Sequence, residues 1–205
     1  MTPSAADTAD TWLLEGFNDP VHGAQETFRA ILQAMSSPGQ VIAVPSPNEQ
    51  PDGISAAATA FLLTLPDYTT PIWLDPALAR EDVRAYFGFH TGAPITSARA
   101  DATFALLQGT EDHLSLDSFS IGTAEYPDRA ATVIIEVKTL SAPAAVRLSG
   151  PGIKSKATVG VSPCAPGLWE ALIKNNALFP LGIDVIFSTP SGVLAVPRST
   201  RIEVL

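Results

Sequence analysis

Residues 132–137, with the sequence TVIIEV, carry the clearest structural signal in this chain of 205 residues. Val133, Ile134 and Ile135 are consecutive β-branched residues, and an unbroken apolar run of this kind is typical of a strand buried in a sheet. The stretch therefore predicts a central strand. Further strands are expected at residues 40–44, 71–74, 102–107, 145–148, 183–187 and 193–196.

Turn residues indicate how some of these strands connect. The segments 183–187 and 193–196 flank the sequence TPSG at residues 189–192, which favours a hairpin. Residues 145–148 are expected to pair with the central strand across the turn at 141–143, and residues 201–205 are expected to extend the last strand.

Helical segments alternate with the strands. Asp19 and Pro20 offer an N-cap followed by proline at the first helical position, and apolar residues then recur at helical spacing as far as Pro38. Ser55 is expected to cap a second, buried helix over residues 56–65. Asp75 and proline after it predict a third helix that ends near residue 87, and a short polar helix or turn is expected at 114–119. A last helix is expected at 166–178.

These elements form one domain, because no repeat and no linker interrupts them. The predicted fold is α/β, with a mixed sheet covered by helices over residues 16–205 and a flexible N-terminal tail at residues 1–15.

The composition of the chain bears on its binding partners and on its location in the cell. A net charge of −9 with only four lysines argues against nucleic-acid binding. No apolar run reaches the ~18 residues of a membrane span and no secretory signal is visible, so we expect a cytoplasmic protein. The single cysteine agrees with a reducing compartment.

Charged residues make up 16% of the chain, against about 25% in typical domains. This favours an obligate assembly, although a large core with a surface of small residues would also explain it.

No self-sufficient catalytic set and no cofactor motif is apparent. The three histidines are widely separated and no cysteine cluster accompanies them, so no metal site is expected. Residues 150–155, GPGIKS, lack the spacing of a phosphate-binding loop and indicate a tight turn. Cys164 is expected to be a buried or spectator thiol.

Three residues are candidates for ligand binding. His90 is expected in a loop between Gly88 and Gly92, or else at a helix C-terminus where an imidazolium interacts well with the dipole. Asp184 lies in an apolar strand and needs a partner, and Arg198 is expected to pair with it across the hairpin. Arg201 follows Arg198 by three residues, so a regular strand would place the two on opposite faces. His90, Asp184 and Arg198 either line a pocket or hold the fold together.

Short blocks of sequence, kept in order from about residue 16 to the end, resemble the PhnH family of the bacterial carbon–phosphorus lyase system. The clearest are residues 179–184 (FPLGID) and 195–200 (AVPRST). The others are residues 28–29 (FR), 34–39 (AMSSPG), 70–74 (TPIWL), 89–94 (FHTGAP), 122–124 (GTA) and 148–153 (LSGPGI).

The resemblance implies a subunit of a core complex with companion G, I and J subunits. That system transfers an alkylphosphonate to ribose C1 of ATP and releases adenine, and its J subunit later breaks the C–P bond. The implied role is structural, with no catalysis by the chain alone, and the isolated chain is either a homodimer or a monomer. The alternative is a subunit that contributes a nucleotide or phosphonate pocket.

The family's fold is similar to the large domain of pyridoxal-phosphate-dependent aminotransferases, without the cofactor. An independent enzyme of that kind is poorly supported, because none of the four lysines lies in a recognisable Schiff-base context.

Overall fold

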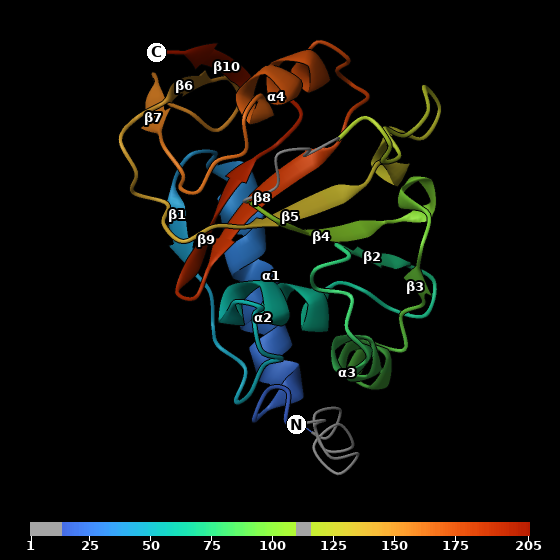
Figure 1. Ribbon diagram of the computed structural model, residues 1–205. Helices are drawn as coiled ribbons and strands as arrows, with labels where there is room; N and C mark the ends of the chain where they lie inside the picture. The colour runs from blue at the N-terminus through green and yellow to red at the C-terminus, as the bar shows by residue number, and fades with distance from the viewer. Residues whose placement is uncertain (1–13, 110–115) are drawn as a thin grey trace, which may run out of the picture.

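A seven-stranded mixed sheet forms the centre of the computed structural model, which describes residues 14–109 and 116–205 (Figure 1). Its strand order is β1-β9-β8-β5-β4-β2-β3. The strands from β3 to β8 run parallel, and β9 and β1 add antiparallel pairs at one edge. In chain order the bounds are β1 Val41–Ala43, β2 Ile72–Leu74, β3 Ile95–Thr96, β4 Phe104–Gln108, β5 Thr132–Glu136, β8 Asp184–Thr189 and β9 Gly192–Val196.

Helices cover both faces of this sheet. In Figure 1, α2 and α3 lie below the sheet, α1 runs from behind it toward the same side, and α4 and a small sheet lie above it. The bounds are α1 Pro20–Ser36, α2 Ala56–Thr64, α3 Glu81–Thr91 and α4 Leu168–Asn176. The small antiparallel sheet has the order β10-β6-β7, with β6 Val146–Ser149, β7 Ala157–Val159 and β10 Arg201–Val204.

The pleat of β5 divides the core into two clusters. Ile134 points into the cluster that contains α1, α2 and α3, whereas Val133 and Ile135 point into the cluster that contains α4 and the small sheet. All three side chains are fully buried. The α/β mixed sheet covered by helices and the central position of residues 132–136 are therefore confirmed.

Several local predictions are also confirmed. The Asp19 carboxylate caps α1 by accepting from the backbone N–H groups of Val21 and His22, and the Ser55 hydroxyl accepts from that of Ala58 at the start of α2. The strands β8 and β9 form the expected hairpin, although its loop is shorter than the four residues suggested. Among the residues described, no helix is long and apolar enough to cross a membrane.

The third helix differs from its prediction at both ends. Asp75 caps a turn instead, since its Oδ1 accepts from Ala77 N–H at 2.9 Å, and α3 begins only at Glu81. The helix then continues through Gly88 to Thr91 and ends where Gly92 adopts a left-handed conformation with φ of 69°. The loop expected between the two glycines is therefore wrong, because only Gly92 acts as the C-terminal stop.

The predicted roles of residues 145–148 and 201–205 are wrong. β5 pairs with β4 and β8, whereas β6 pairs with β7 and β10 in the separate sheet. A turn in which Thr200 N–H donates to Pro197 C=O turns the chain away from β9, and Arg147 then pairs with Glu203 at 3.1 Å across the small sheet. Sequence analysis did not anticipate the short strands β3 and β7.

The remaining predicted segments are the glycine-rich turn, the polar segment and the N-terminal tail. The turn at Gly150–Gly152 is confirmed, and a Cβ atom at Gly152 would lie 2.1 Å from the Ser36 carbonyl oxygen. The polar segment expected at 114–119 lies partly outside the described residues, and its described part is a turn. Most of the tail predicted at residues 1–15 also lies outside them.

Candidate functional site

The predicted pair of Asp184 and Arg198 forms at the amino-terminal end of β8. The guanidinium Nη2 lies 2.6 Å from Asp184 Oδ2, and Nε lies 3.2 Å from each carboxylate oxygen. The backbone N–H of Arg198 also donates to Oδ1 at 2.8 Å. The side chains are only 14% and 13% exposed, so this is a largely but not fully buried ion pair with several hydrogen bonds.

Further contacts tie this pair into the fold. Arg198 Nη1 donates to the carbonyl of Pro127, and the Asn176 side chain at the end of α4 donates to the Arg198 carbonyl at 2.8 Å. The pair thus joins β8, the end of β9, α4 and the segment before β5. These contacts are internal to the chain, and a ligand-binding role for the pair stays a prediction.

His90 lies elsewhere, in the last turn of α3. Its Nε2 is 2.9 Å from the Leu14 carbonyl oxygen, and its ring packs 4.6 Å from the ring of Tyr86. Within the described part of the chain, no contact joins His90 to Asp184 or Arg198. The helix C-terminus that sequence analysis considered for His90 is where the structure places it, whereas the three candidates do not form one cluster.

Glu136 is a carboxylate at the opposite end of the same strand pair, and sequence analysis missed it. In the register of β5 and β8, Thr132 faces Asp184 and Glu136 faces Ser188. Glu136 Oε1 accepts from the backbone N–H of Ser55 at 2.8 Å. The Ser55 hydroxyl in turn lies 2.8 Å from the hydroxyl of Ser188, which is completely buried.

Burial raises the pKa of Glu136 to about 7, and hydrogen bonds from the Ser55 backbone and side chain offset only part of this effect. Among the residues described, none forms an ion pair with Glu136. The acid is therefore held by neutral donors alone, in the environment expected of a group that exchanges protons or meets a ligand.

A cleft of about 380 Å³ opens beside this carboxyl group. It lies where the carboxyl ends of β5 and β8 meet the N-terminus of α2, and parallel sheets commonly bind ligands beyond the carboxyl ends of their strands. We call it the Glu136 cleft; it is lined by Gln50, Gly53, Ile54, Ser55, Glu136, Val137, Lys138 and Pro190. An ionisable residue inside the run TVIIEV was the sequence signal that could have led to it.

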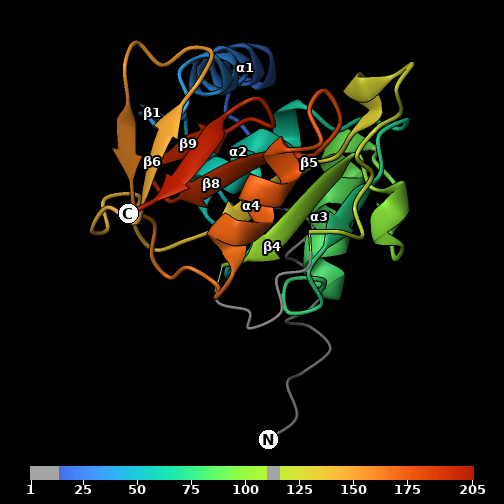
Figure 2. The ribbon, with the colours of Figure 1, turned by 90° about the horizontal axis from the view of Figure 1, so that it is seen from above.

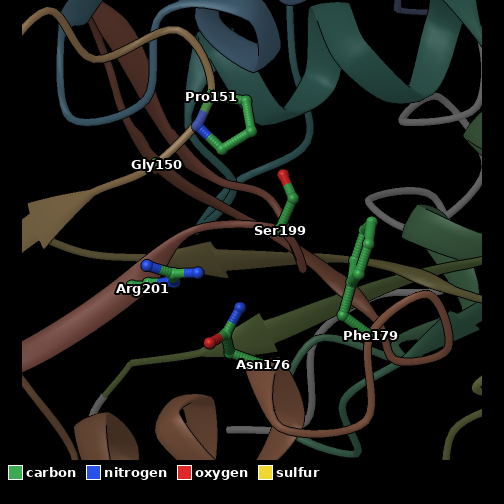
Figure 3. A pocket seen from close by; sticks show the side chains of 6 residues that line it. All are labelled: Gly150, Pro151, Asn176, Phe179, Ser199 and Arg201. Atoms are coloured by element: carbon green, nitrogen blue, oxygen red, sulfur yellow. The ribbon is translucent and has the colours of Figure 1, made fainter.

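A second cleft, of about 510 Å³, lies between the end of α4 and the small sheet (Figure 3). It is lined by Gly150, Pro151, Asn176, Phe179, Ser199 and Arg201. Arg198 is bound to Asp184 and does not line this cleft. Arg198 and Arg201 therefore do not line one cleft. The turn between β9 and β10 separates them, so the regular strand on which the spacing prediction rested is absent there.

Neither metal nor thiol chemistry is indicated in the part of the chain that the structure describes. There, no group of three His, Cys, Asp or Glu side chains could hold a metal ion. Burial and the nearby Glu170 raise the pKa of the Cys164 thiol, which disfavours the reactive thiolate.

Comparison with known proteins identifies the family. The model of the family described as bacterial phosphonate metabolism protein (PhnH) matches residues 15–203. This chain belongs to the PhnH family. The family resemblance drawn from the short sequence blocks is thereby confirmed.

Two named relatives cover most of the chain. The alpha-D-ribose 1-methylphosphonate 5-triphosphate synthase subunit PhnH of Rhizobium meliloti (strain 1021) is 35% identical over 200 residues, which are 96% of this chain and 98% of that protein. The putative C-P lyase subunit protein HtxG of Stutzerimonas stutzeri is 33% identical over 181 residues, which are 87% and 85% of the two chains. Both relatives are named as subunits of larger assemblies.

Proposed function

We propose that this chain is a subunit of the assembly that makes alpha-D-ribose 1-methylphosphonate 5-triphosphate in phosphonate catabolism. The observation that carries the proposal is the alignment with a subunit of that synthase over 98% of the relative's length. The reaction would transfer an alkylphosphonate to ribose C1 of ATP and release adenine. The partners would be the companion G, I and J subunits, and the complex would work in the cytoplasm.

The surface of α1 supports a role in assembly. Val21, Phe28 and Leu32 lie on one face of this helix and are 82%, 45% and 52% exposed, whereas the residues on the side that packs on the core are buried: Thr27, Ile31 and Ala34. Figure 2 shows α1 at the margin of the molecule, beside the β1 edge of the sheet. An exposed apolar stripe together with a low content of charged residues is what a chain with a permanent partner would carry.

Two finer features belong to the same proposal. The fold would resemble the large domain of the pyridoxal-phosphate-dependent aminotransferases without its cofactor, and the isolated chain would form a homodimer. A homodimer would cover apolar surface that a companion subunit covers in the complex, so its dissociation on mixing with companions would be expected.

Growth and co-purification test the proposal together. A strain lacking this gene should grow on inorganic phosphate but not on methylphosphonate, and a plasmid copy should restore growth. The tagged chain should retain the companion subunits on an affinity column. Normal growth of the deletion strain on methylphosphonate, or elution of the chain without companions, would contradict the proposal.

The apolar stripe offers a sharper variant. Leu32→Glu should lower recovery of companion subunits at least about tenfold, because it places a charge on an apolar interface. Gln33→Glu on the same exposed half of α1 is the matched control and should leave recovery unchanged. Equal recovery with both variants would remove the stripe from the interface.

A further inference from the structure

We propose that the Glu136 cleft binds a small zwitterion, with a primary ammonium group against Glu136 and a phosphonate group toward Lys138. The choice of phosphonate as the anionic group rests on the proposed function. The dipolar character of the ligand rests on the residues of the cleft themselves.

Glu136 has no counter-charge among the residues that the structure describes. Its carboxyl group is largely withdrawn from water, and its described partner is the neutral backbone N–H of Ser55, beside the hydroxyl pair of Ser55 and Ser188. A buried carboxylate is stable only when a cation or several donors compensate for lost hydration. A ligand ammonium supplies both, because it carries a positive charge and three N–H donors.

A positive charge also lines the cleft. Lys138 is exposed, lines the same cleft and forms no ion pair with any described residue. Lys138 follows Glu136 by two residues, so the Cα atoms of the two residues are at most about 7 Å apart, the value for extended backbone. A ligand with an ammonium and an anionic group one or two carbons apart matches this pair of opposite charges.

The size and place of the cleft agree with such a ligand. Its volume of about 380 Å³ lies at the lower end of the range for small-molecule sites. The cleft in Figure 3 is a different environment, because its lining contains Arg201 but no carboxylate. It offers no carboxylate as a counter-charge to an ammonium, and it therefore provides a control.

Calorimetry on the full chain, alone and in its co-purified complex, tests the inference at pH 7.5. The probes are 2-aminoethylphosphonate, ethylphosphonate, which lacks the ammonium, and propylamine, which lacks the phosphonate. The intact protein should bind 2-aminoethylphosphonate at least about tenfold more tightly than either single-ended probe, because both charged ends contribute.

Variants assign each end of the ligand. Glu136→Gln should bind 2-aminoethylphosphonate no better than ethylphosphonate, whereas Lys138→Met should weaken both phosphonates and leave propylamine unchanged. Arg201→Ala in the other cleft should change nothing. If Glu136→Gln fails to fold, the exposed Lys138→Met still tests the phosphonate end.

Three results would overturn the inference: no measurable binding of 2-aminoethylphosphonate, no preference for it over ethylphosphonate, or a preference that persists in Glu136→Gln. The two proposals fail separately. If the chain supports normal growth on methylphosphonate but shows no preference for 2-aminoethylphosphonate, only the proposal for the Glu136 cleft is overturned. The preference in a chain that does not support growth would overturn the subunit role alone.

Discussion

Asp184 and Glu136 occupy opposite ends of the paired strands β8 and β5, and their surroundings differ in one respect. Asp184, at the amino end, is bound by the guanidinium of Arg198 through several hydrogen bonds. Glu136, at the carboxyl end, meets the backbone N–H of Ser55 and has no ion pair within the described ranges. One end of the sheet therefore neutralises its acid internally, whereas the other leaves an acid beside an open cleft. The comparison separates a structural carboxylate from a candidate functional one.

The largest effect is expected at the internally paired end. Asp184→Asn should lower the free energy of unfolding by about 3–5 kcal/mol, because it leaves the largely buried Arg198 guanidinium without its counter-charge. Urea denaturation measures this loss. Glu203→Gln, which removes the exposed partner of Arg147, is the control and should cost at most about 1 kcal/mol.

A double-mutant cycle sharpens this result. Arg198→Met combined with Asp184→Asn should be less destabilising than the sum of the single variants, because the second substitution removes a charge that the first left unpaired. Additive losses would mean that the two side chains do not stabilise the fold as a pair.

A smaller effect, opposite in sign, is expected at the other end. The pKa of Glu136 is about 7 in the folded chain, against an ordinary value of 4.5. Below pH 4.5 both states are protonated; between pH 4.5 and 7 the unfolded chain loses its proton first, so wild-type stability falls. Glu136→Gln removes this loss and should be more stable than wild type by roughly 2–3 kcal/mol at pH 8, but not at pH 4.5.

Urea denaturation of both proteins from pH 4.5 to pH 8 measures the difference directly. A stability difference that stays constant over this range would show that Glu136 titrates alike in the folded and unfolded chains. The comparison with Asp184 would then lose its basis.

The smallest effect is expected for Ser55→Ala. This change removes the hydroxyl that caps α2 and contacts Ser188, so it should cost about 1–2 kcal/mol. It should also raise the pKa of Glu136 further, since the Ser55 side chain lowers it in the intact protein. Carboxyl resonances followed by NMR report this shift. A pKa that does not move would remove the hydroxyl from the environment of Glu136.

Local signals explain which parts of the fold could be predicted. Asp19 and Ser55 cap helices through backbone groups two or three residues away, and the apolar run at residues 132–137 identifies a central strand by itself. The prediction that Asp75 caps a helix was wrong because its carboxylate accepts a hydrogen bond from Ala77 N–H within a tight turn. The pairing of strand β10 was predicted wrongly because its partner, β6, lies about fifty residues earlier in the chain.

The candidate site depends on contacts between residues that are far apart in the sequence. The pair of Asp184 and Arg198 was predictable because a hairpin brings residues 14 apart together. The partner of Glu136, Ser55, is 81 residues distant, and Ser55 and Ser188 are separated by 133 residues. The sequence shows an acid in an apolar run, but only the folded sheet and α2 show what surrounds it.

Direct titration of the Glu136 carboxyl group by carbon-13 NMR, with Glu136→Gln to assign its resonance, tests whether this acid lacks a counter-charge until a ligand binds. The pKa of Glu136 should be about 7 in the free protein and lower when 2-aminoethylphosphonate is bound, since an ammonium favours the carboxylate. A Glu136 carboxyl that titrates near 4.5 in the free protein, with no change on adding the zwitterion, would contradict this prediction.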